Sequence, residues 1–255
     1  MNNMNNMNNM INMDNIIINF NKDSDILIYI IYHDEESFKL ASIFLKYNWA
    51  RLRKIDSTKY FENIIFSYLD INRDEWINKK FVGFLTYNSY KKINIFDIEK
   101  LANQYSDYDV ISLNNSFNIP LLLITEHYHP NFINIWEQIL LILGYNINDI
   151  LSLEIPLYYN NYWLAKPEWL NKYIIFYKKV IDIMENNILI RNMLYQNSTY
   201  PGKLLEHPQK LIKICGRPYY TYHTFIFERL VCFFFWVEKA KLYQTRLEND
   251  HFLNI

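Results

Sequence analysis

Short apolar runs alternate with amphipathic segments along the first half of the chain. Three runs rich in β-branched and aromatic residues have the length of buried strands, and they cover residues 26–32, 80–87 and 108–113. Between them, segments such as residues 61–69 repeat apolar positions at the spacing of a helix. Strands that alternate with helices are typical of a mostly parallel or mixed sheet flanked by helices. The pattern therefore predicts an α/β fold.

The second half of the chain is dominated by longer helical patterns. Residues 131–145, 166–187 and 223–243 repeat apolar positions at helical spacing. Gly144 stands where a helix commonly ends, and Pro167 stands in a first turn, where proline is favoured. We therefore expect a helix-rich C-terminal half.

The first 24 residues form a separate segment. Their Met-Asn-Asn repeat has no hydrophobic period of a helix or strand, which predicts a disordered tail. The remaining residues 25–255 have the length of one large domain. We expect residues 25–118 to form one half of it and residues 119–255 the other.

Composition excludes several classes of protein. The 26 basic and 27 acidic residues leave a net charge of −1, which argues against a dedicated nucleic-acid binder. Cys215 and Cys232 can form neither a disulfide framework nor a zinc site, which favours the reducing cytoplasm. The longest apolar runs reach about half the length of a transmembrane helix. We expect a cytoplasmic protein with no transmembrane segment and no signal peptide.

The sequence gives little evidence for a glycine-rich phosphate-binding loop or for an acidic metal-binding motif. No glycine-rich loop follows a predicted strand, which disfavours both a dinucleotide oxidoreductase and a P-loop kinase. Two Asp-x-Asp strings, at residues 23–25 and 107–109, could hold a divalent metal on a diphosphate. Both strings precede strands and so fall at the amino edge of the sheet, away from the usual ligand site. We predict no metal site from the sequence.

Polar and aromatic residues follow two of the predicted strands. Tyr32 and His33 come after the first strand, and Tyr87, Lys91 and Lys92 come after the second. If these strands are neighbours, the two groups converge and offer ring faces for a base and cations for phosphate. The alternative is a capped helix beside a polar turn.

Two further segments carry candidate acid–base chemistry. Residues 125–130 read as a loop in which Glu126, or alternatively His127, could accept the proton of a sugar hydroxyl. A zinc site built on His127 and His129 lacks an evident third ligand. Glu228 and Arg229 lie in a strongly apolar helix, where an internal ion pair and a ligand contact are both open.

The aromatic stretch at residues 158–173 divides into two parts. Residues 167–173 begin a helix, and we expect Tyr173 to lie in the core. The irregular run before it offers amide and ring groups that can bind a sugar, so Asn161, Tyr162 and Trp163 are candidates for the acceptor side.

Several of these pieces, in their order along the chain, resemble a family of bacterial and viral glycosyltransferases. That family comes from polysaccharide gene clusters and was long known only as a domain of unknown function. The resemblance covers most of residues 26–236. The matching residues are Glu62, Val82, Gly83, Phe84, Tyr87, Asn161, Tyr162, Tyr173, Glu228 and Arg229.

The resemblance implies a GT-A-like fold that binds a nucleotide-diphospho-sugar in its first half and a saccharide acceptor in its second half. The implied donor-binding residues are Tyr32, His33, Glu62, Tyr87, Lys91 and Lys92. Where the family has His-Tyr-Arg-Arg, residues 86–89 read Thr-Tyr-Asn-Ser, so the phosphate contacts would move to the lysines. Mn²⁺ or Mg²⁺ could accompany the nucleotide-sugar. A non-catalytic carbohydrate-binding or interaction module on the same fold is the alternative.

Overall fold

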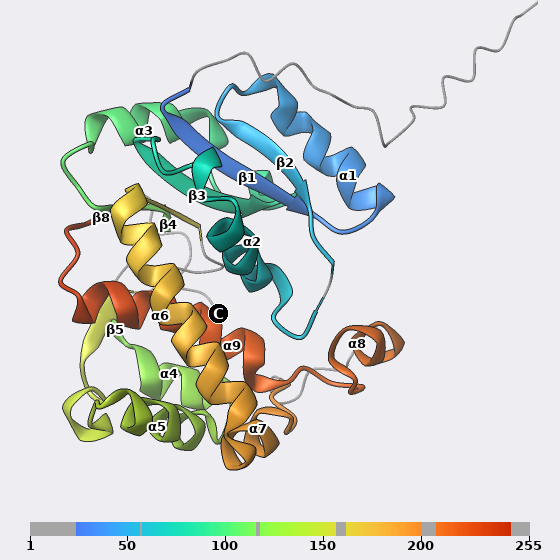
Figure 1. Cartoon of the computed structure of the whole chain (residues 1–255), viewed down its shortest axis with the longest axis vertical. Helices are drawn as coiled ribbons and strands as arrows, with labels where there is room; N and C mark the ends of the chain where they lie inside the picture. Colours follow the sequence, from blue (N-terminus) through green and yellow to red (C-terminus); the bar gives the residue numbers. More distant parts are fainter. Residues whose placement is uncertain (1–23, 57, 116–117, 157–161, 200–207, 246–255) are drawn as a thin grey trace, which may run out of the picture.

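A computed structural model describes residues 24–56, 58–115, 118–156, 162–199 and 208–245 (Figure 1). Its centre is a six-stranded mixed sheet in the order β2-β1-β3-β7-β4-β8. The predicted tail, apart from Ser24, lies outside the described residues.

The sheet is parallel except at one position. Strand β7 runs antiparallel to both of its neighbours, β3 and β4, whereas the other pairings are parallel. A second, two-stranded antiparallel sheet joins β5 and β6. The strands are β1 (Ile26–Tyr32), β2 (Ala50–Lys54), β3 (Phe81–Thr86), β4 (Val110–Asn115), β5 (Asn118–Pro120), β6 (Glu154–Pro156), β7 (Trp163–Ala165) and β8 (Leu242–Thr245). The predicted α/β fold with a mixed, mostly parallel sheet is confirmed.

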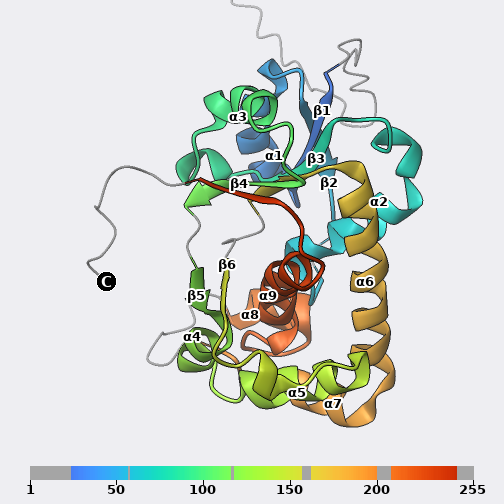
Figure 2. The same cartoon turned by 90° about the vertical axis from the view of Figure 1, so that its left-hand side faces the viewer.

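Helices cover the sheet and form the lower part of the molecule in Figures 1 and 2, where α6 runs from beside the sheet to α7. The α-helices are α1 (Glu35–Ala41), α2 (Ile65–Ile71), α3 (Ile98–Gln104), α4 (Leu121–Tyr128), α5 (Phe132–Leu143), α6 (Pro167–Asn186), α7 (Ile188–Leu194), α8 (Pro208–Cys215) and α9 (Tyr222–Val237). Short 3₁₀ turns are η2 (Ser42–Lys46), η3 (Phe61–Ile64), η4 (Arg73–Glu75), η5 (Ser89–Lys91), η6 (Ile95–Asp97) and η7 (Ile147–Asp149). The expected helix over residues 223–243 is too long, because α9 ends at Val237 and β8 follows.

Strand β1 explains why its sequence is a continuous apolar run. Alternate residues of a strand point to opposite faces of the sheet. Leu27, Tyr29 and Ile31 belong to the core beneath α2, α6 and α9, whereas Ile26 and Ile28 belong to the core beneath α1 and α3. Both faces are therefore covered, and no position of β1 up to Ile31 needs a polar side chain.

Strand β7 approaches β3 closely at Gly83. A Cβ atom at this position would lie 2.5 Å from the carbonyl oxygen of Trp163 and 2.7 Å from Cδ2 of Leu164. Both distances are shorter than real Cβ contacts, so only glycine allows β7 to pack here without a shift.

Strand β2 is an edge strand with charged residues on it. Arg51 Nη1 lies 2.7 Å from Glu75 Oε2, and the hydroxyls of Tyr29 and Tyr68 each donate to the same carboxylate at 2.8 Å. Burial alone would raise the pKa of Glu75, but these three hydrogen bonds outweigh it and the pKa is lowered. The carboxylate thus connects β2, β1 and α2.

Candidate functional site

Three parallel strands end together at one edge of the sheet, which we call the carboxyl edge. Its strand ends are Tyr32 of β1, Lys54 of β2 and Thr86 of β3. The amino end of the antiparallel strand β7 lies at the same edge, because Leu164 pairs with Gly83. This is where ligands of open α/β sheets bind.

His33 and Tyr87 meet at the carboxyl edge, as the sequence predicted for neighbouring strands. Nδ1 of His33 lies 3.2 Å from the carbonyl oxygen of Ile55. Because a carbonyl oxygen can only accept a hydrogen bond, Nδ1 is the ring nitrogen that donates here. The backbone N–H of Tyr87 donates to the carbonyl of Ile31 at 3.0 Å. The two rings are edge to face, with centroids 6.4 Å apart. Both side chains are half-buried and reach the edge from different strands.

Tyr162 joins the ends of β3 and β4. Its hydroxyl lies 3.3 Å from the hydroxyl of Thr86, which also donates to Oδ1 of Asn88 at 2.7 Å. Its carbonyl accepts the N–H of Leu113 at 2.8 Å. Burial raises the pKa of the phenol, the Thr86 hydrogen bond opposes this, and the charges of two glutamates, Glu62 and Glu228, raise it further. Tyr162 therefore lies within the electric field of both carboxylates.

The two adjacent lysines point to different places. Nζ of Lys92 lies 5.9 Å from the ring centre of Tyr162, at the carboxyl edge. Nζ of Lys91 lies 5.8 Å from the ring of Tyr90, which packs edge to face against Phe44. Of the pair, Lys92 is the cation that faces the site.

Glu62 of η3 and Glu228 of α9 add carboxylates to this edge. Burial raises the pKa of Glu228, Arg229 lowers it, Glu62 raises it and Lys92 lowers it. The pKa of Tyr87 is raised by burial and then by the charges of Asp34 and Glu62. Tyr87 after β3, Glu62 of η3 and Glu228 of α9 thus influence one another's charge states, although they are far apart in the sequence.

Arg229 is mainly an internal partner of Glu228. It forms an ion pair with that carboxylate, and its Nε donates to Oγ1 of Thr125 at 3.2 Å. Its side chain is buried, whereas the side chain of Glu228 keeps 24% of its exposure. The predicted internal ion pair is present, and Glu228 is the more accessible member. The sequence signal for Glu228 was its position as a single acidic residue within an apolar helix.

Glu126 and His127 do not lie in a loop, as the sequence suggested, because residues 121–128 form helix α4. The carboxylate of Glu126 accepts the N–H groups of Asn131 and Ile133, both at 2.7 Å, at the start of α5. Such a carboxylate satisfies amides that a helix leaves without partners. His127 is exposed, and its ring lies 5.0 Å from that of Tyr128.

Four other residues named from the sequence lie in packed or undescribed positions. Trp163 is 1% exposed, and its ring lies edge to face against Phe235 at 5.3 Å, so no ring face is available to a sugar. Tyr32 packs against Phe38 with centroids 5.1 Å apart. Tyr173 is fully buried, as predicted. Asn161 lies outside the described residues.

The Asp-x-Asp string before β4 holds strands together. Asp107 forms an ion pair with Lys241, and Oδ2 of Asp109 accepts the N–H of Lys241 at 2.8 Å. Oδ1 of Asp109 lies 3.4 Å from Nζ of Lys166. The carboxylates therefore connect β4 to β8 and to the start of α6. Among the described residues, no three His, Cys, Asp or Glu side chains are grouped as for a metal ion.

Comparisons with protein-family models, with curated proteins and with solved structures found no match for this chain. Within the described part of the chain, no helix has both the length and the hydropathy needed to cross a membrane. The resemblance to glycosyltransferases stays a prediction, and any functional argument depends on the geometry of the carboxyl edge.

Proposed function

We propose that this chain is a glycosyltransferase that moves a sugar from a nucleotide-diphospho-sugar to a saccharide acceptor at the carboxyl edge. The observation that carries the proposal is that Lys92 lies over Tyr162 at the carboxyl edge while its charge acts on Glu228, and that the charge of Glu62 acts on both Glu228 and Tyr87. A cation, a proton acceptor and an aromatic face are what a diphosphate, an acceptor hydroxyl and a nucleoside require.

Lys92 is the group proposed for the leaving diphosphate. Its ammonium is exposed and lies above Tyr162, so it can approach a ligand without first breaking an ion pair that the described residues form. When the bond between the sugar and the diphosphate breaks, negative charge grows on the phosphate oxygens. A cation fixed at that point stabilises the transition state more than the bound substrate.

Glu228 is the group proposed to take the acceptor proton, in place of Glu126. Burial raises the pKa of Glu228 more than its ion pair with Arg229 lowers it, which makes it a stronger base than an exposed glutamate. The acceptor oxygen bonds to the anomeric carbon, its proton passes to Glu228, and the electron pair of the broken bond leaves with the diphosphate. Glu126 is engaged by two backbone amides.

His33 and Tyr87 are proposed to bind the nucleoside. Their edge-to-face rings flank the end of β1, where a base can stack. Tyr32, turned towards Phe38, would support this position through packing.

The experiment is donor hydrolysis and transfer with a panel of nucleotide-diphospho-sugars, with and without Mn²⁺, read as nucleoside diphosphate release. We expect Lys92→Ala to lower kcat/KM by about 100-fold. Lys91→Ala is the matched control, because it removes the same charge one residue away, beside Tyr90. Equal losses in both variants would contradict the assignment of Lys92.

Glu228→Gln separates binding from chemistry. The amide keeps the size of the side chain but cannot take the proton, so donor binding should persist in calorimetry while transfer is lost. Turnover at the wild-type rate would remove Glu228 from the mechanism. Saccharide binding without turnover of any donor would instead support the non-catalytic carbohydrate-binding module.

A further inference from the structure

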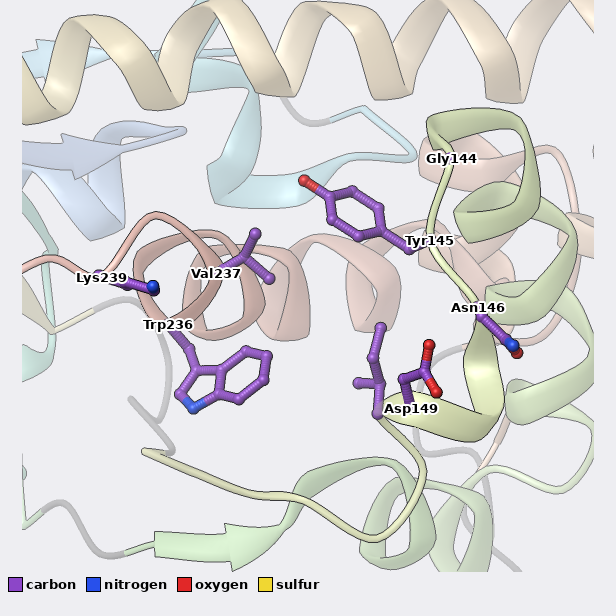
Figure 3. Close-up of a pocket in the computed structure, with 8 residues that line it drawn as sticks. Gly144, Tyr145, Asn146, Asp149, Trp236, Val237 and Lys239 are labelled. Carbon is purple, nitrogen blue, oxygen red and sulfur yellow. The ribbon is translucent and has the colours of Figure 1, made fainter.

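A concave site lies where α5 and α9 end, apart from the carboxyl edge. Its volume is about 450 Å³, and it is lined by the turn after α5, by η7 and by the end of α9 (Figure 3). It shares no lining residue with the carboxyl edge described above. Gly144 and Lys239 both have left-handed backbones, with φ of 89° and 57°, and these turns end the two helices at the pocket.

Aromatic and aliphatic side chains form the walls of this pocket. Figure 3 shows the indole of Trp236 and the ring of Tyr145 on two sides of the opening, with Val237 between them. Tyr145 is held from behind by Phe233, edge to face at 5.2 Å. Among the described residues, no aromatic ring pairs with Trp236, whose side chain is half-buried. The indole packs partly against the core and exposes the rest of its surface beside the fixed phenol.

Two side chains of the pocket carry opposite charges. Asp149 and Lys239 both line the pocket and are exposed. Within the described ranges, neither side chain forms a hydrogen bond or an ion pair. The pocket thus presents a charged acceptor and a charged donor, together with the hydroxyl of Tyr145 and the amide of Asn146, whose Oδ1 accepts the N–H of Asn148.

These two properties disfavour a ligand with a net charge. An organic cation would stack on the indole but would meet the charge of Lys239, and an anion would meet Asp149. A neutral ligand with an apolar face and several hydroxyls can stack, donate to Asp149 and accept from Lys239 at once. A pyranose ring is such a ligand.

We propose that this pocket is a binding site for one or two residues of a neutral saccharide, separate from the site at the carboxyl edge. Such a site would hold a glycan chain on the protein independently of donor chemistry.

The test uses the full chain with ¹⁵N-labelled indoles and three neutral tetrasaccharides: cellotetraose, maltotetraose and chitotetraose. The Trp236 resonance is assigned from its loss in Trp236→Phe. We expect at least one tetrasaccharide to shift this resonance saturably. Asp149→Ala should weaken that binding about tenfold, which corresponds to about 1.4 kcal/mol. Asp149 is exposed on the surface, so this variant is expected to fold.

Two controls keep the outcomes distinct. Lys92→Ala should bind the tetrasaccharide as the wild type does, because Lys92 lies at the other site, so failure of the glycosyltransferase proposal leaves this one intact. Tetramethylammonium chloride and sodium acetate should leave the resonance in place. A shift with either of these ions and none with a saccharide, or no shift with any probe, would overturn the proposal.

Discussion

The hydroxyl of Tyr162 lies 3.3 Å from the hydroxyl of Thr86, so the residue before β7 is bound to the last residue of β3. Tyr162→Phe removes this contact but keeps the ring beneath Lys92. We expect kcat/KM for the nucleotide-sugar to fall about fivefold, because one hydrogen bond contributes about 1 kcal/mol. Steady-state kinetics measures the change. Tyr90→Phe, beneath Lys91, is the matched control and should behave as wild type; equal effects in both would contradict a special role for Tyr162.

The acid limb of the pH–rate profile should report Glu228. Burial raises the pKa of this carboxyl above its ordinary 4.5, and the charge of Glu62 raises it further. The deprotonated form is the base, so kcat/KM should fall as the pH drops through this raised pKa. Glu62→Gln removes a negative charge and should move the limb to lower pH. A limb that stays in place or moves upward in this variant would show that another group titrates.

Gly83→Ala should destabilise the sheet. The added methyl group would meet the carbonyl of Trp163 at 2.5 Å, and backbone cannot yield as a side chain can. We expect the free energy of unfolding to fall by about 1–3 kcal/mol, as for other overpacked sites. Urea titration measures it. Gly144→Asn is the control, since asparagine tolerates a left-handed backbone and nothing lies within 4 Å of that position. A smaller loss for Gly83→Ala than for this control would refute the steric argument.

His223 should make the protein less stable in mild acid. Burial is the main cause that lowers the pKa of its imidazole from 6.5 to about 3. The charge of Lys59 also lowers this pKa, whereas the charge of Glu185 opposes the shift. The unfolded chain binds a proton near pH 6.5 and the folded chain does not. Stability is therefore lost as the pH falls from 6.5 towards 3, by up to about 1.4 kcal/mol per pH unit.

The variant His223→Gln should flatten this slope, even if it lowers stability at every pH. Urea unfolding at pH 6.5, 5.5 and 4.5 gives the slope for both proteins. His127→Gln is the control, because His127 is exposed on α4. If the slope of His223→Gln equals that of the wild type, the imidazole is not kept neutral by the fold.

Elements that were predictable from the sequence are those whose environment is uniform along their length. Strands β1 and β3 are covered on both faces, so their apolar runs are continuous. Helix α6 begins at Pro167 and α5 is followed by Gly144, whose φ of 89° few other residues adopt. Local chemistry alone determines these boundaries.

Other elements depend on partners that the local sequence does not show. Strand β2 reads Ala-Arg-Leu-Arg-Lys, which suggests a polar turn until Arg51 is paired with Glu75. Strand β7 has three residues, too few for any period, and it is a strand because β3 and β4 hold it from both sides. Its burial also removed Trp163 from the candidate binding residues.

The candidate site shows the same limit. The convergence of β1 and β3 followed from the rule for parallel strands, so His33 and Tyr87 could be placed together in advance. Glu62 and Glu228 are separated by most of the chain, and only the packing of η3 and α9 brings them near enough for the charge of Glu62 to raise the pKa of Glu228. Glu126 was misplaced because a helix cannot be distinguished from a loop over the short stretch that carries it.

Strand β7 also sets an order for assembly. Strands β2 and β3 each pair with β1, and all three lie in about the first third of the chain, so they can associate early. Strand β4 reaches them only through β7, which is made about fifty residues later. Until that strand arrives, β3 and β4 each keep an open edge of unpaired amides and carbonyls, the kind of surface on which partly made chains aggregate. Three residues in the middle of the sheet thus close one edge of β3 and one edge of β4 together, and the other edge of β4 is closed only when β8 is made.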